Sequence, residues 1–230
     1  MTTPSTKSAV ASGQRRGRAP QRQSLRDRAY EIIKKEIITC KLRPGEIIGE
    51  AHLSDRLGIG RTPVHQALDR LMTDGLVEVM PRKGVIVKPL SLDEAFAIVE
   101  MRLLTEGYCA GVAAERIEQG LIDRLEDNLD RMRLAIDKRR LEEILELDSE
   151  FHSLVASAGG NSVMKEILAN LHDRATRFWF ISLKSTEHQN RVLEQHTDIV
   201  KAISAHKAEE AKAAMRRHIE QFSSNLTSMM

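Results

Sequence analysis

One stretch limits the possible folds more than any other: an amphipathic helix pattern followed at once by two alternating segments around a basic turn. From Val64 to Leu71, apolar residues recur at helical spacing, which places them on one helix face. The turn between the two alternating segments contains Arg82, Lys83 and Gly84. A short helix followed by a two-stranded hairpin of this kind predicts a winged helix-turn-helix.

The residues before this stretch supply the rest of such a domain. Ser24 followed by Asp27 predicts the start of a first helix, because a hydroxyl caps free N–H groups and an acid favours the positive helix end. A second helix is expected around 51–57, and a glycine-containing turn separates it from the third. The winged helix-turn-helix domain is therefore predicted over residues 24–88.

Polar side chains at the start of the third helix and in the wing are candidates to contact double-stranded DNA. A recognition helix needs a cation and hydrogen-bonding groups where it enters the major groove, and a basic wing suits phosphate contact. A winged helix that binds protein instead is the alternative. The predicted DNA-binding residues are Arg61, Thr62, His65, Gln66, Arg82, Lys83 and Gly84.

The charge is distributed unevenly along the chain. The first 88 residues carry a net charge of +8 and the remainder −6, so the first part favours a polyanion. Residues 1–23 hold five basic side chains, no acid and almost nothing to bury, which predicts a disordered basic arm. An organellar transit peptide is the alternative for this segment, although it lacks an amphipathic stripe.

The composition also excludes some classes of protein. No apolar run approaches the ~20 residues that cross a bilayer, and the start lacks the apolar core of a secretory signal. We therefore expect no membrane partner. Cys40 and Cys109 have neither disulfide nor metal spacing, so we expect a reducing, cytoplasmic location.

The second half is predicted to be an all-helical domain over residues 91–228. Ser91 followed by Glu94 is a capping-box pattern that opens its first helix. No strand pattern follows, so the predicted fold class is mainly α, with a winged helix-turn-helix before a bundle of six or seven helices. Helical periodicity runs through about 92–117, 121–137, 141–158, 162–184, 188–205 and 208–227.

Four ionisable side chains stand where apolar residues are expected. Asp148 and His152 lie one turn apart on one stripe, and His196 and His218 interrupt two others. A buried carboxylate needs a partner, and one carboxylate with three imidazoles suits zinc or a neighbouring divalent transition metal, not calcium. The pattern equally allows an Asp148–His152 pair and histidines hydrogen-bonded within the core. The remaining histidines of the helical half are interpreted as structural or exposed: His172, His188 and His206.

Arg102 also lies on an inward stripe, with Ile98 and Cys109. A buried guanidinium needs an anion, which it can bind with two parallel hydrogen bonds. Glu106, one turn later, is one candidate for that anion. The other is the carboxylate of a small ligand bound at the metal, so Arg102 is predicted as a ligand-binding residue.

Both halves resemble the GntR family of bacterial transcription regulators, specifically its FadR-type branch with the helical FCD ligand-binding domain. The resemblance covers about residues 24–227. The motifs that carry it are 53–64, Ala67-Leu68, 74–77 and 82–85 in the first half, and 100–106, 148–152, 195–199 and His218 in the second.

The resemblance implies a homodimer on an operator with two-fold symmetry. It implies a metal, commonly zinc, nickel or manganese, held by the residues that match Asp148, His152, His196 and His218. It also implies a small organic acid beside the metal, helped by Arg102. Family members usually have Arg-Glu where this chain has His65-Gln66. Because a neutral imidazole cannot imitate a bidentate arginine on guanine, we expect an operator unlike the commonest site of the family.

The function predicted from these observations is a ligand-responsive transcription regulator in the bacterial cytoplasm, associated with the nucleoid. We expect a repressor that a small carboxylate metabolite releases from DNA, and no enzymatic activity. One alternative is a metal-dependent enzyme that activates water or oxygen at the site of one Asp and three His. The other is a metal-free helical sensor whose polar groups pair internally.

Overall fold

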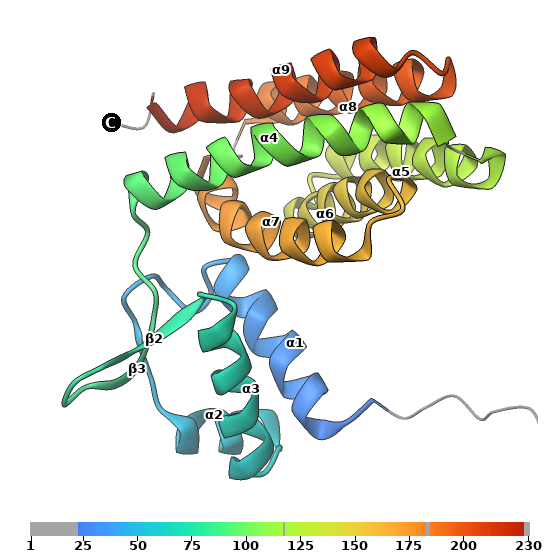
Figure 1. Cartoon of the computed structure of the whole chain (residues 1–230). Helices are drawn as coiled ribbons and strands as arrows, with labels where there is room; N and C mark the ends of the chain where they lie inside the picture. Colours follow the sequence, from blue (N-terminus) through green and yellow to red (C-terminus); the bar gives the residue numbers. More distant parts are fainter. Residues whose placement is uncertain (1–22, 117, 183–184, 228–230) are drawn as a thin grey trace, which may run out of the picture.

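The computed structural model describes residues 23–116, 118–182 and 185–227. The predicted basic arm falls almost entirely on residues 1–22, outside the described residues. In the described part, a winged helix-turn-helix precedes a helical bundle (Figure 1), and the predicted fold class is confirmed.

The winged domain contains three helices and a small antiparallel sheet. The strands lie in the order β1-β3-β2, with Ile48 opposite Val85 and Glu78 opposite Ile86. The wing formed by β2 and β3 projects away from the bundle (Figure 1). The elements are α1 (Leu25–Ile38), β1 (Ile47–Ile48), α2 (Glu50–Leu57), α3 (Arg61–Thr73), β2 (Val77–Met80) and β3 (Gly84–Val87).

Local chemistry explains where these elements begin and end. The Ser24 hydroxyl accepts a hydrogen bond from the Asp27 backbone N–H at 3.1 Å, as its sequence position predicts. Gly58, at φ +63°, ends α2 in the left-handed conformation that glycine adopts without strain. A buried apolar cluster from α1, α2, α3 and the sheet then holds the domain together; its largest fully buried members include Ile33, Ile37, Leu53, Leu68, Leu71 and Leu76.

Six helices and no strand make up the described part of the second domain. α4 runs beside α9 and also contacts α6, α7 and α8 (Figure 1). A separate apolar cluster fills the interior of this bundle. The helices are α4 (Leu92–Arg116), α5 (Gln119–Asp137), α6 (Leu141–Ala158), α7 (Ser162–Ser182), α8 (Thr186–Ser204) and α9 (Ala208–Thr227).

The two domains meet through polar contacts and a short connection. β3 ends at Val87 and α4 begins at Leu92. The Ser91 hydroxyl accepts from the Glu94 N–H at 3.4 Å, while the Glu94 carboxylate contacts Lys88 and Arg174. The Glu94 backbone N–H therefore takes part in the N-terminal cap of α4, and its side chain forms ion pairs at the domain junction.

The two apolar side chains Leu68 and Met72 on α3 provide a test of the core of the winged domain. Leu68 is 1% exposed and Met72 is 36% exposed. Replacing Leu68 by Ala leaves a cavity and is expected to lower the free energy of unfolding of this domain by ~2–5 kcal/mol. Met72→Ala, the matched control one turn away, is expected to change it by less than ~1 kcal/mol. Urea unfolding measures both, and equal effects would contradict this packing.

Candidate metal centre and nucleic-acid interface

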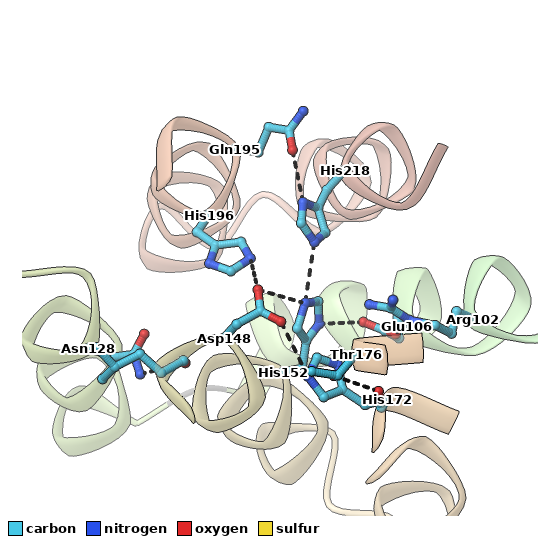
Figure 2. Close-up of polar contacts among 11 residues, drawn as sticks. Arg102, Glu106, Asn128, Asp148, His152, His172, Thr176, Gln195, His196 and His218 are labelled. Atoms are coloured by element: carbon cyan, nitrogen blue, oxygen red, sulfur yellow. Dashed lines mark hydrogen bonds and ion pairs between the residues drawn. The ribbon is translucent and has the colours of Figure 1, made fainter. Parts of the chain in front are cut away.

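The four predicted metal ligands converge inside the bundle (Figure 2). α6 contributes Asp148 and, one turn later, His152; α8 contributes His196, and α9 contributes His218. None of the four side chains is more than 7% exposed. They face inward because each replaces an apolar residue on the buried stripe of its helix.

Their donor atoms point toward one another. Oδ1 of Asp148 lies 3.5 Å from Nε2 of His196 and 4.0 Å from Nε2 of His152. The Nε2 atoms of His152 and His218 are 3.3 Å apart. The three imidazoles offer ligand atoms that all lie within 4.8 Å of one another, a spacing that one cation can bridge.

Hydrogen-bonding groups behind two of the imidazoles orient them. Glu106 lies 2.5 Å from Nδ1 of His152, and the Gln195 side-chain oxygen lies 2.9 Å from Nδ1 of His218. These acceptors favour the tautomers with the proton on Nδ1, which leaves Nε2 of each ring able to bind a metal. The two Nε2 lone pairs then face each other, and a cation between them would satisfy both.

The electrostatics of the cluster also fit a cation. Burial lowers the pKa values of His196 and His218 well below the usual range, so these rings are neutral, as metal ligation requires. Burial raises the pKa of Asp148 to about 6, although His152 and Arg102 act in the opposite direction. Oδ1 of Asp148 and both ring nitrogens of His196 are buried without a hydrogen bond. One carboxylate and three imidazoles, with several donor atoms that no hydrogen bond uses, fit a divalent transition metal.

The sequence interpretation missed His172 of α7. This side chain is buried, and its Nε2 lies 3.3 Å from Oδ2 of Asp148. Asp148, His152 and His172 form a second group of candidate ligands, whose donor atoms all lie within 4.8 Å of one another. The signal was present in the sequence, because His172 falls on one helical stripe with the buried residues Leu168 and Ala175. His188 and His206 belong to neither group.

Arg102 pairs with Glu106, the internal partner considered from the sequence. Its Nε donates to one carboxylate oxygen, while the other oxygen faces His152. Burial alone would raise the pKa of Glu106, but Arg102 and His152 hold this pKa well below its usual range. Nη2 of Arg102 is buried with no hydrogen bond. Arg102 therefore contacts the buried Asp and His cluster through Glu106, and its Nη2 is not used by a hydrogen bond.

The predicted DNA-binding residues lie on the surface of the winged domain. Arg61, Thr62, His65 and Gln66 are exposed in the first two turns of α3, opposite its buried face. Arg82, Lys83 and Gly84 are exposed at the tip of the wing. This hairpin tip is tight, with φ +67° at Arg82 and φ +90° at Gly84.

His65 lies between two carboxylates. Its Nδ1 is 3.0 Å from Glu50 of α2, and its Nε2 is 3.7 Å from Asp69, one turn further along α3. The hydrogen bond to Glu50 and the charge of Asp69 raise the pKa of His65 above its usual value. The protonated fraction is therefore larger than for an isolated imidazole, and an imidazolium offers two donors where a neutral ring offers one. This environment was not predictable from the position of His65 alone.

Comparison with protein families follows the same division into two domains. The profile of the FCD domain matches residues 97–221, and that of the gntR family of bacterial regulatory proteins matches residues 25–87. The chain belongs to the GntR family, in the branch with an FCD domain. It is thus a DNA-binding transcriptional regulator of GntR/FCD type. Among the described residues of this GntR regulator, no helix is long and apolar enough to cross a membrane.

Relatives of this GntR regulator match along most of its length. The HTH-type transcriptional repressor RspR of Escherichia coli strain K12 is 27% identical over 204 residues, covering 89% of this chain and 90% of RspR. The repressor GlaR of the same strain is 26% identical over 206 residues, covering 83% of this chain and 90% of GlaR. The solved structure of E. coli McbR/YncC superposes with a TM-score of 0.81 at 19% identity, covering 90% of this chain and 99% of that one. At that identity the superposition establishes a shared fold.

Metal content provides the direct test of the cluster. Metal-free wild-type protein is incubated with Zn²⁺, Ni²⁺ or Mn²⁺ and then dialysed. We expect it to retain stoichiometric metal, measured by inductively coupled plasma mass spectrometry. His196→Gln removes one imidazole at similar volume and is expected to weaken retention by more than ~10-fold. Wild-type protein is also expected to gain ~2.7 kcal/mol of stability at a metal concentration 100 times the dissociation constant.

His206→Gln is the matched control, because His206 is exposed, its ring contacts the Ala114 carbonyl, and it belongs to neither group of candidate ligands. This variant is expected to retain metal like the wild type. Absence of stoichiometric metal from the wild type, with no change in melting temperature on metal addition, would instead favour the metal-free sensor.

Proposed function

We propose that this GntR regulator is a repressor that binds a two-fold symmetric operator as a homodimer and is released by a small carboxylate metabolite. The metabolite binds beside a divalent transition metal, with zinc as the first choice and nickel or manganese as the others. The single observation that carries the proposal is the buried set of Asp148 and three imidazoles beside Arg102, in a chain whose other domain binds DNA. As a bacterial repressor it would act in the cytoplasm, at the nucleoid.

Base reading is assigned to the start of α3. Arg61 is exposed in its first turn and offers a bidentate donor to guanine, while Thr62 and Gln66 offer hydrogen bonds to other base edges. His65 takes part as an imidazolium when it is protonated between Glu50 and Asp69. The wing residues Arg82, Lys83 and Gly84 contact the phosphate backbone beside that helix.

Effector binding is assigned to the side of the cluster near Arg102 and His218. A small pocket beside His218 is also lined by Phe222 and Arg191, and the Arg102 guanidinium lies 5.9 Å from the Phe222 ring centroid. We assign the unused Nη2 of Arg102 as the donor to the effector carboxylate. The metal would polarise and anchor the carboxylate, and Arg102 would fix its orientation.

Dimer formation is assigned to the exposed apolar side chains of α4 and α7. Met101, Leu104 and Tyr108 of α4 are 43%, 68% and 55% exposed, and they recur at helical spacing. Val163 and Ile167 of α7 are also exposed. The two helices run antiparallel, since Glu94 meets Arg174 at one end and Cys109 meets Met164 at the other. A second copy is the occupant that suits this face, because an operator with two-fold symmetry requires one.

Arg61→Ala tests the assignment of base reading. The variant is expected to lose ~1–3 kcal/mol of affinity for an operator selected in vitro and to relax specificity at the bases that Arg61 contacts. Fluorescence anisotropy at fixed salt measures this affinity. Arg133→Ala, which removes an exposed arginine of α5, is the matched control and should bind as the wild type does. Unchanged operator affinity in Arg61→Ala would contradict the docking.

Arg102→Lys tests the assignment of effector binding while keeping a positive charge beside Glu106. The lysine lacks the planar fork, so DNA and metal binding should persist while release from the operator by a carboxylate weakens by more than ~10-fold. Succinate and any acid found by mass spectrometry of the purified protein serve as probes. An undiminished response in metal-loaded Arg102→Lys would exclude the role of Arg102.

A further inference from the structure

α7 lies between the metal cluster and the winged domain. Its inward face carries His172 against Asp148, while residues before and after His172 contact the winged domain and the domain junction. We infer that His172 positions Asp148 for metal binding and makes α7 the element through which occupancy of the metal centre alters the DNA-binding domain. This inference rests on the proposed function, because it requires a metal at Asp148.

His172 faces Oδ2 of Asp148, the carboxylate oxygen that His152 and His196 do not face. His196 and His152 face Oδ1 of Asp148, whereas Nε2 of His172 lies 3.3 Å from Oδ2. The His172 ring is buried and both of its nitrogens lack a hydrogen bond. When Oδ1 ligates a cation, an N–H donor at Oδ2 fixes the rotation of the carboxylate. His172 is therefore a positioning residue, whose ring must follow Asp148 when the carboxylate turns toward a metal.

The next residue, Asp173, joins α7 to the first helix of the winged domain. Its carboxylate forms an ion pair with Lys34 of α1, and both side chains are largely buried, at 17% and 21% exposed. Burial raises the pKa of Asp173, and Lys34 opposes that shift. Separating the pair would leave a desolvated carboxylate without its counterion, so a movement of α7 at His172 is transmitted to α1.

Three more residues of α7 hold the end of the recognition helix and the domain junction. The Asn170 side-chain amide donates to the Asp74 carbonyl, the C-cap of α3, at 2.9 Å. Arg177 donates to the Lys88 carbonyl at 2.5 Å, and Arg174 pairs with Glu94 at the start of α4. Residues 170–177 therefore contact the metal cluster on one side and the DNA-binding domain on the other within about two helical turns.

The contacts between α7 and the winged domain described above are polar, and this favours a switch between two arrangements. Hydrogen bonds and ion pairs can exchange partners after a small shift, whereas a tightly packed apolar interface resists one. Allosteric coupling requires that each ligand distinguish the two arrangements by its contacts. Metal binding would do so through Asp148 and His172, and operator binding through α3 and its Asp74 end.

The experiment compares operator affinity of metal-free and Zn²⁺-loaded full-length protein by fluorescence anisotropy, on the same in vitro selected operator. Wild-type protein is expected to change its operator dissociation constant by a factor of about 5–150 on Zn²⁺ binding. Asp173→Asn should keep the wild-type zinc affinity but reduce that factor toward one. Glu166→Gln, an exposed acid on the same helix, is the matched control and should keep the full factor.

His172→Gln tests the other end of the proposed connection. This variant keeps the four proposed metal ligands and should still bind zinc, about 10–100-fold more weakly. At saturating zinc, the change in operator affinity should be smaller than in the wild type. Amide hydrogen exchange provides a second readout: zinc should change protection in α1 and at the end of α3 in the wild type and in Glu166→Gln only.

The outcomes separate this inference from the proposed function. If wild-type protein binds none of Zn²⁺, Ni²⁺ and Mn²⁺, or binds no duplex, the proposed function itself fails; if it binds only Ni²⁺ or Mn²⁺, the same comparison is made with that ion. If it binds metal and duplex, and Asp173→Asn and His172→Gln keep the full wild-type coupling factor, α7 is not the connecting element. Zinc binding without any change in operator affinity would also overturn the inference, and metal and DNA binding would remain established.

Discussion

The carboxylate of Asp148 is the group on which the organisation of the bundle interior depends. It is 1% exposed, and its oxygens meet three imidazoles from three different helices. An ionised carboxylate in such surroundings is unstable unless positive charge or strong donors reach it. The arrangement of α6, α7 and α8 around this one side chain, with His218 of α9 beside it, therefore fits the proposed binding of a cation.

Much of this architecture could be predicted from the sequence, because each helix carries a regular apolar stripe with recognisable ends. The bounds differ only slightly: α8 begins at Thr186, two residues before the predicted start near 188. The four predicted ligands were visible because each places an ionisable group on such a stripe. His172 follows the same rule, because it shares a helical stripe with the buried residues Leu168 and Ala175, although from the sequence we interpret it as structural or exposed.

The contacts around the ligands could not be predicted in the same way. Periodicity shows which face of a helix is buried, but it does not define how one helix is rotated against another. The pairing of Gln195 with His218 and of Glu106 with His152 depends on that rotation. Likewise, His65 and Glu50 are 15 residues apart and meet only because α2 and α3 cross in the winged domain. Sequence periodicity therefore indicates which ionisable side chains are buried better than it indicates which groups contact them.

The burial of the ligand cluster affects how fast a bound ion can exchange. With every donor atom enclosed by helices, an ion can leave only when the bundle opens locally, and such openings are slow compared with diffusion. A bound ion would then be a long-lived component, acquired around the time of folding and retained through many cycles of gene control. Rapid signals would then have to come from a more weakly bound organic molecule that exchanges at the edge of the centre. The ion would complete the effector site, and the effector would change DNA binding.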